Sequence, residues 1–198
     1  MPNSLEIKHI AGTAVPIEGN DIDTDRIIPA RFLKEITFEN MGNYLFHDER
    51  VTQDGQKTTH PLNLPKFKNA TIMIVGNNFG CGSSREHAAQ AVKRYGITAI
   101  IGESYSEIFS GNCKNIGVPT LIVSPSIQKD LTKMATTFPD TPIHIDLETL
   151  TLTTSGNTYP LQLSPEWQTA FLNGTWNAIE TLKANTDLIR QKDMELPY

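Results

Sequence analysis

The chain has 198 residues, which suits one domain of ordinary size and would allow two small ones. It holds 17 Lys and Arg residues against 22 Asp and Glu residues, and the resulting net charge of -5 argues against a nucleic-acid-binding role. The longest apolar run, residues 72–75, is far shorter than the roughly 20 residues of a membrane-spanning helix. With two cysteines and no signal-peptide pattern at its start, the chain is expected to work in the reducing cytoplasm.

The first third of the chain predicts one strand followed by an irregular region. Residues 10–17 predict the strand, and a polar turn at 18–25 leads into a short apolar stretch at 27–29. Residues 34–69 mix turn formers with His47, His60 and aromatic side chains. We expect a long ordered loop region there, of a kind that often carries function.

The middle of the chain predicts alternating strands and helices. Strands are expected at 71–76, 98–101 and 119–123, and apolar residues recur at helical spacing after each one. The predicted helical faces are Ala88, Ala91, Val92 and Tyr95, then Tyr105, Ile108, Phe109 and Asn112, then Leu131, Met134, Ala135 and Phe138. Short strands joined by crossover helices predict a parallel sheet with right-handed connections.

After Pro139 the pattern predicts three antiparallel strands, at 143–147, 150–154 and 158–163. Ser164 and Pro165 then begin a helix that ends at Gly174. The polar tail, residues 183–198, is expected either to pack on a partner or to fray. We expect residues 1–198 to form a single α/β domain.

A glycine-punctuated loop, residues 77–87, follows the predicted strand at 71–76 and opens a helix. Such a loop directs backbone N–H groups and the positive end of the helix at one point, where anions bind. Arg85 stands where a dinucleotide fingerprint needs its third glycine, and no Walker lysine follows. The final glycine of a nucleophile elbow is missing as well. The loop therefore predicts an anion site outside the standard nucleotide and hydrolase classes.

A purely structural interpretation of this loop is a capping box, in which Ser83 caps the helix and Glu86 reaches back to it. Ser104 and Glu107 repeat the spacing at the next predicted helix, without flanking glycines or a neighbouring arginine. The box alone favours a structural role. The two glycines beside Ser83 and the carboxylate-binding side chain of Arg85 shift the balance toward function.

Residues 82–87, Gly-Ser-Ser-Arg-Glu-His, resemble the signature of the aconitase superfamily's swivelling domain. The preceding Asn-Phe-Gly-Cys at 78–81 is similar to the 3-isopropylmalate dehydratase small-subunit family, and Asp-Thr-Asp-Arg-Ile-Ile-Pro at 23–29 resembles a second motif of that family. The resemblance spans most of the chain. It implies a swivelling β/β/α domain, a parallel or mixed sheet with flanking helices, and a hydro-lyase that isomerises 2-isopropylmalate and 3-isopropylmalate in leucine biosynthesis.

The resemblance also implies a division of labour between two subunits. The Lewis acid of this family is a 4Fe-4S cluster held by three cysteines, whereas this chain has only Cys81 and Cys113. We therefore expect this chain to bind no cofactor and the cluster to lie on a large partner subunit. A dicarboxylate is the expected substrate.

Carried over by position, Ser83 matches the serine whose ionised hydroxyl acts as the base, and Ser84 would donate a hydrogen bond to substrate. Arg85 would bind a substrate carboxylate or hold the serine anion. Asp25 matches an acidic residue that pairs with a group on the partner, and Arg31 would be a second carboxylate clamp.

The substrate's side group is expected to meet the loop at 32–46. Most apolar residues of this loop are expected to fill the core, but an isopropyl group needs an apolar wall. Leu33 is the first choice because it lies close to the possible clamp at Arg31.

Other interpretations remain open. The chain could instead be a related hydro-lyase acting on homoaconitate or a methyl-substituted malate, and a substrate with a third carboxylate would require Arg or Lys in place of apolar residues. A non-catalytic anion-binding module would bind its ligand tightly without a partner. Metal sites are not expected, because Cys81 and His87 lack a zinc-ligand spacing and the aspartates at 21, 23 and 25 lack the Gly and Glu of a calcium loop.

Overall fold

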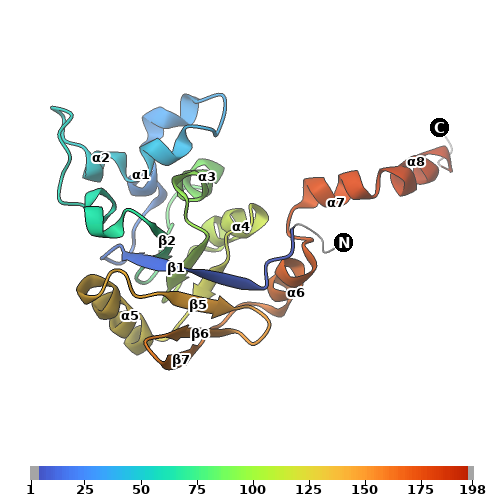
Figure 1. The fold of residues 1–198 in the computed structure, drawn as a ribbon. Coiled ribbons are helices and arrows are strands. Elements are labelled where there is room, and N and C mark those ends of the chain that lie inside the picture. Colours follow the sequence, from blue (N-terminus) through green and yellow to red (C-terminus); the bar gives the residue numbers. More distant parts are fainter. Residues whose placement is uncertain (1–4, 196–198) are drawn as a thin grey trace.

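The computed structural model describes residues 5–195, and its seven strands form one sheet in the order β4-β3-β2-β1-β5-β6-β7 (Figure 1). Four neighbouring strands are parallel: β1 (His9–Pro16), β2 (Ala70–Ile74), β3 (Ala99–Gly102) and β4 (Thr120–Ile122). The antiparallel strands β5 (Ile143–Asp146), β6 (Thr151–Thr154) and β7 (Asn157–Pro160) extend the sheet from the other side of β1. The expected α/β fold with a mixed sheet is confirmed.

Helices cover both faces of this sheet (Figure 1). Successive residues of β2 point to opposite faces, as the two-residue period of a strand requires. Met73 packs in the cluster that contains the inner faces of α3 (Glu86–Tyr95) and α4 (Glu107–Asn115). Ile72 and Ile74 pack in the cluster that contains α5 (Pro125–Thr137) and α6 (Pro165–Asn173).

The region expected to be irregular consists of short helical turns joined by loops. They are α1 (Thr24–Ile27), η1 (Ala30–Lys34), η2 (Met41–Tyr44), α2 (His47–Arg50), η3 (Pro61–Asn63) and η4 (Pro65–Phe67). Met41, Leu45 and Phe46 are fully buried, and four further apolar residues of this loop are partly buried against the same cluster, so the expectation that most of them fill the core is confirmed. Ile36 is the exception in this loop, since its side chain is 99% exposed.

The predicted inner face of α4 was correct at Phe109 and wrong at Ile108. Ile108 is 51% exposed, whereas Phe109, Ser110 and Cys113 are buried. The periodic pattern began at Tyr105, which lies before the helix and whose hydroxyl donates to the carbonyls of β3 and β4. A loop residue anchored on the sheet therefore imitated the first position of a helical face.

The last described part of the chain, which includes most of the predicted tail, forms two helices, α7 (Ala178–Ala184) and α8 (Thr186–Met194), which extend away from the sheet (Figure 1). The sequence analysis did not predict helices there, and residues 196–198 of the predicted tail lie outside the described residues. We name residues 178–194 the C-terminal arm. None of the helices in the described part of the chain is long and apolar enough to cross a membrane.

Candidate active site

The two sequence motifs lie side by side at one edge of the sheet, just beyond the ends of β1 and β2. The backbone N–H of Gly80 donates to the carbonyl of Ile22 over 2.8 Å, and the N–H of Thr24 donates to the carbonyl of Cys81 over 2.9 Å. β1 and β2 are parallel neighbours, so their carboxyl ends meet at the same edge. The segments that follow them therefore form one site, which we define as residues 22–25 and 80–85.

Thr24 holds the glycine loop in place. It is 1% exposed, and its hydroxyl donates to the carbonyl of Ser83 over 3.0 Å. Its backbone N–H already binds Cys81, so Thr24 fixes the loop on both sides of Gly82, whose φ is 91°. The sequence analysis did not identify Thr24, although a buried hydroxyl inside a motif of charged residues is a signal for such a role.

Gly80 is required by packing. Its φ is 76°, and a Cβ atom there would lie 2.2 Å from Cγ of Phe109 in the core. Any other residue would have to displace this buried ring. The sequence analysis expected this glycine to let the backbone approach a ligand closely. At Gly80 it is instead Phe109 of α4 that lies close to the backbone.

Ser83 and Ser84 are both exposed, and their hydroxyls form no hydrogen bond with any residue that the structure describes. The predicted cap was wrong, because α3 begins at Glu86 with Arg85 in the N-cap position and no side-chain cap. Glu86 accepts a hydrogen bond from Gln90 instead of reaching back. The left-handed backbone at Gly82 and the extended backbone at Arg85, with φ of -130°, delay the helix and leave the Ser83 hydroxyl free.

The second Ser-x-x-Glu sequence is not a capping box either. α4 begins at Glu107 with Ser106 in the N-cap position, again without a side-chain cap. The Ser104 hydroxyl donates to the side-chain oxygen of Asn77 over 2.5 Å and accepts from the backbone N–H of Asn78 over 2.8 Å. Ser104 therefore ties two loops together.

Arg85 and Asp25 form an ion pair across the two segments of the site. The Arg85 side chain is 18% exposed, whereas that of Asp25 is 56% exposed. Asp25 thus has a partner within this chain, where the sequence analysis expected one on another subunit. A guanidinium has five N–H donors, so Arg85 keeps others for a second carboxylate.

Arg31 and Leu33 belong to a neighbouring cluster. The Arg31 guanidinium donates to Asp48 over 2.9 Å and lies 3.1 Å from Nδ1 of His47. This contact lowers the pKa of the Asp48 carboxyl. Leu33 is half-buried against the core. Among the described residues, no hydrogen bond or ion pair joins either side chain to Ser83.

No group of three metal-ligating side chains gathers within residues 5–195. Burial raises the pKa of the Cys81 thiol, and Cys113 lies fully buried in the core. His87 packs edge-on against Phe38, with ring centroids 5.2 Å apart. Asp23 caps α1 by accepting from the backbone N–H of Arg26 over 2.8 Å. The contacts of these four candidate metal ligands are thus those of side chains that support the fold.

Comparison with known proteins gives consistent matches. Residues 5–125 match the family model described as Aconitase C-terminal domain. A 3-isopropylmalate dehydratase small subunit from Thermus thermophilus is 47% identical over 189 residues, which cover 96% of this chain and 94% of that protein. The corresponding protein from Synechocystis is 44% identical over 193 residues, 98% of this chain and 95% of its own length. The crystal structure of a 3-isopropylmalate dehydratase from Methanocaldococcus jannaschii superposes with a TM-score of 0.67 at 26% identity, covering 93% of this chain and 99% of that one.

Proposed function

The chain belongs to the 3-isopropylmalate dehydratase small-subunit family, and from this premise we propose that Ser83 is the general base of its reaction. The observation that carries the proposal is the unengaged Ser83 hydroxyl, exposed on a loop whose backbone is clamped by Thr24. The reaction interconverts 2-isopropylmalate and 3-isopropylmalate by removing water and adding it back. The name small subunit implies a large partner, with which the site would be shared.

The base removes a proton from the carbon next to a carboxylate. The electron pair of that C–H bond forms the double bond of 2-isopropylmaleate while hydroxide leaves the neighbouring carbon, and the reverse steps add water in the other orientation. A serine is a weak base unless its anion is stabilised. The guanidinium of Arg85, two residues away, and the nearby start of α3 supply positive potential for that purpose.

The other site residues bind the substrate. Ser84 offers a free hydroxyl as donor, and Arg85 offers the N–H groups that Asp25 leaves unused. Asp25 orients Arg85 and remains exposed enough to meet a group of the partner. Arg31 would clamp the second carboxylate, which must replace Asp48 as its ligand.

The departing hydroxide needs a Lewis acid, and we assign this role to a 4Fe-4S cluster on the large subunit. The residues of this chain do not fit such a cluster, because the chain has only two cysteines and Cys113 is buried on the inner face of α4. We propose that the whole chain acts as one domain in the cytoplasm, where a reducing environment protects iron-sulfur chemistry.

The test is to purify the chain alone under anaerobic conditions, measure its iron and assay 2-isopropylmaleate. We expect no bound iron and no turnover until the large subunit is added. Stoichiometric iron with turnover by the isolated chain would contradict the proposed division. Tight binding of isopropylmalate by the isolated chain, with no turnover after addition of the partner, would instead favour a regulatory anion-binding module.

Leu33 is the proposed wall for the isopropyl group. Replacing Leu33 with Arg should weaken use of isopropylmalate and favour a substrate with a third carboxylate, because apolar contacts discriminate by about 1 to 3 kcal/mol per methylene. The measurement is kcat/KM for both substrates in protein shown to be folded and assembled. An unchanged preference would exclude Leu33, and a wild-type preference for the third carboxylate would favour a homoaconitate-type enzyme.

A further inference from the structure

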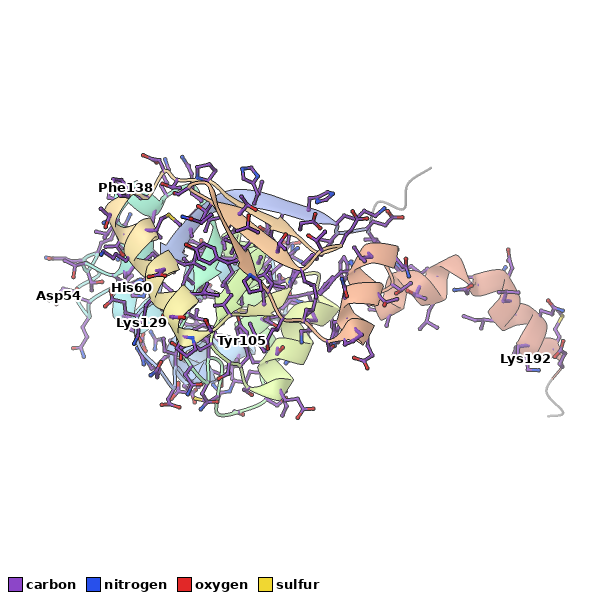
Figure 2. All side chains as sticks on the ribbon, turned by 90° about the horizontal axis from the view of Figure 1, so that it is seen from below. Asp54, His60, Tyr105, Lys129, Phe138 and Lys192 are labelled. Atoms are coloured by element: carbon purple, nitrogen blue, oxygen red, sulfur yellow. The ribbon has the colours of Figure 1, made fainter. Side chains whose placement is uncertain are left out.

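The C-terminal arm carries most of the large hydrophobic side chains that are exposed in the described part of the chain. Five of the eight large hydrophobic side chains exposed in the described chain lie on it. They are Ile179, Leu182, Leu188, Ile189 and Met194. Figure 2 shows the arm projecting from the body, with Lys192 near its far end. Exposed apolar residues gathered on one element are typical of an interaction site.

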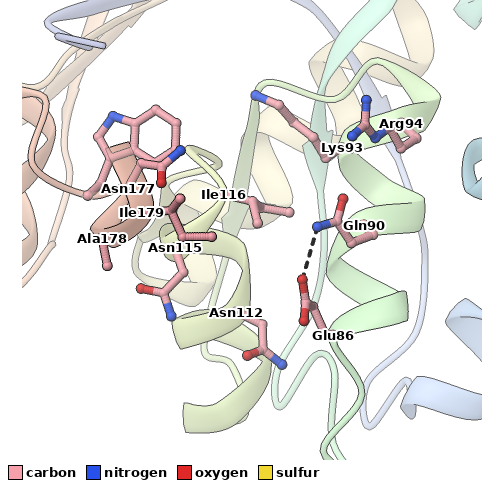
Figure 3. Close-up of a pocket in the computed structure, with 11 residues that line it drawn as sticks. Glu86, Gln90, Lys93, Arg94, Asn112, Asn115, Ile116, Asn177, Ala178 and Ile179 are labelled. Carbon is pink, nitrogen blue, oxygen red and sulfur yellow. Dashed lines mark hydrogen bonds between the residues drawn. The ribbon is translucent and has the colours of Figure 1, made fainter. Parts of the chain in front are cut away.

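A groove lies at the root of the arm, between α3, α4 and the start of α7 (Figure 3). Its volume is about 550 Å³, and its walls include Ile116, Trp176 and Ile179. Lys93 lines the groove, and burial lowers the pKa of its ammonium group. Neither Lys93 nor the adjacent Arg94 forms an ion pair with a residue of the described chain. A partner with a carboxylate at this point would complement the groove.

The groove also reaches the edge of the candidate site. Glu86 lines it and is the first residue of α3, directly after Arg85. A protein that covers Ser83 and Arg85 could therefore continue along α3 into the groove and onto the arm. The surface of the proposed site and the apolar surface of the arm are thus continuous.

We propose that the groove and the C-terminal arm form a docking surface for the large subunit, through an apolar segment that places a carboxylate opposite Lys93. This inference rests on the proposed function, because that function requires a large subunit over the same end of α3. The arm would add affinity at a distance from the reacting atoms, so that assembly and chemistry can be separated by mutation.

A second copy of this chain fits the arm less well. Outside the arm, the exposed large hydrophobic residues of the described chain lie in three separate segments: Ile36 in the loop after η1, Ile108 on α4 and Phe138 at the end of α5. Two arms cannot form a regular coiled coil, because Asn185 interrupts the helix between α7 and α8. The ion pairs Lys183–Glu180 on the arm and Lys192–Glu195 at its end each close within one chain.

The test compares full-length variants that differ only in where a charge is placed. Leu188→Glu lies on the arm, and Phe138→Glu is its matched control because both side chains are 64% exposed. The affinity of each variant for the cognate large subunit is measured by analytical ultracentrifugation. We expect the dissociation constant to rise about tenfold or more for Leu188→Glu and to stay within about twofold for Phe138→Glu.

A second pair of variants examines the groove without altering the arm. Lys93→Gln should weaken the complex and reduce its salt dependence, whereas Lys129→Gln on the opposite face of the sheet should change neither. Unchanged affinity in both Leu188→Glu and Lys93→Gln would overturn the docking surface. Self-association of the isolated chain that Leu188→Glu abolishes, with no effect on the large subunit, would overturn the choice of partner.

Measuring kcat distinguishes a failure of this inference from a failure of the proposed function. At saturating large subunit, Leu188→Glu should recover the wild-type kcat, whereas Ser83→Ala should bind normally and lose kcat. If Ser83→Ala keeps its turnover while Leu188→Glu still weakens assembly, the assigned base is wrong and the docking surface stands. If Leu188→Glu instead loses kcat at saturation while binding normally, the docking role is overturned.

Discussion

Two loops of this molecule carry the same Ser-x-x-Glu spacing before a helix, and their serines have opposite environments. The Ser104 hydroxyl donates to Asn77 and accepts from Asn78, so both of its functions are used inside the protein. The Ser83 hydroxyl is exposed and forms no hydrogen bond with a described residue, whereas its carbonyl is held by Thr24. The comparison shows that backbone anchoring, with the hydroxyl left free, distinguishes the serine suited to chemistry.

The glycines produce this difference. Gly80 and Gly82 have φ values of 76° and 91°, which turn the loop so that its carbonyls face α1. The glycine before Ser104, Gly102, ends β3 without a positive φ, and the Ser104 side chain turns inward. A loop whose backbone is already held in place has lost its conformational entropy during folding, so a free hydroxyl on it can receive a substrate without breaking internal hydrogen bonds.

The largest expected effect comes from Ser83→Ala. Loss of the general base should reduce kcat by about 10² to 10⁴ in the complex with the large subunit. The free energy of unfolding should change little, because the removed hydroxyl has no partner in the described chain. Steady-state kinetics and urea unfolding measure the two quantities. A stability loss without a kinetic loss would return Ser83 to a structural role.

Arg85→Lys should have the next largest effect. Lysine keeps the charge but cannot bind a carboxylate at two points while also pairing with Asp25. A lost charged hydrogen bond of roughly 1.5 to 3 kcal/mol corresponds to a fall in kcat/KM of about ten- to a hundredfold. The control is Arg26→Lys, whose arginine also forms an ion pair, with Glu49. Equal kinetics for the two variants would remove Arg85 from the site.

Thr24→Val tests the hydrogen bond that holds the Ser83 carbonyl in place. The variant removes the hydroxyl that binds the Ser83 carbonyl and keeps the volume of the buried side chain. We expect kcat to fall about two- to tenfold, the equivalent of one hydrogen bond, and the pH dependence of kcat to shift because the base is less well placed. Thr24→Ser retains the hydroxyl and should restore the wild-type pH profile. A loss of stability with an unchanged profile would show that Thr24 only supports the fold.

The sequence predicted the sheet and both ends of α6 well, and the starts of α3 and α4 poorly. The strands were identified because β-branched residues such as those at 72–75 and 99–101 pack on both faces of the sheet. The start of α3 was not identified, because the sequence pattern of a capping box does not determine the backbone angles of the glycines before it. The arm was missed because its apolar residues cover no core of this chain, and tertiary packing is what makes a helical face recognisable.

The residues of the candidate site could be recognised from the sequence, whereas their contacts could be predicted only in part. The two motifs were recognised separately, and their pairing follows once β1 and β2 are parallel neighbours. The pairing of Arg85 with Asp25 and the clamp at Thr24 depend on side-chain directions that no spacing encodes. Arg31 shows the opposite case, because its residue type suits a clamp while its contacts in this chain go to Asp48 and His47.

Ser104→Ala should have the smallest kinetic effect and completes the comparison of the two loops. Its hydroxyl makes two hydrogen bonds that tie the loop before α4 to Asn77 and Asn78, so the variant should lose about 1 to 2 kcal/mol of unfolding free energy. The Ser83 carbonyl is held from the other side, by Thr24, so kcat per folded molecule should stay within about twofold. Urea unfolding and kcat of the assembled enzyme are measured on the same preparation as Ser83→Ala. Opposite losses in the two variants, stability for Ser104 and turnover for Ser83, are the expected result. A kinetic loss of a hundredfold or more in Ser104→Ala would mean that Asn77 and Asn78 position the Ser83 loop, and the proposed site would then extend to the loop before α4.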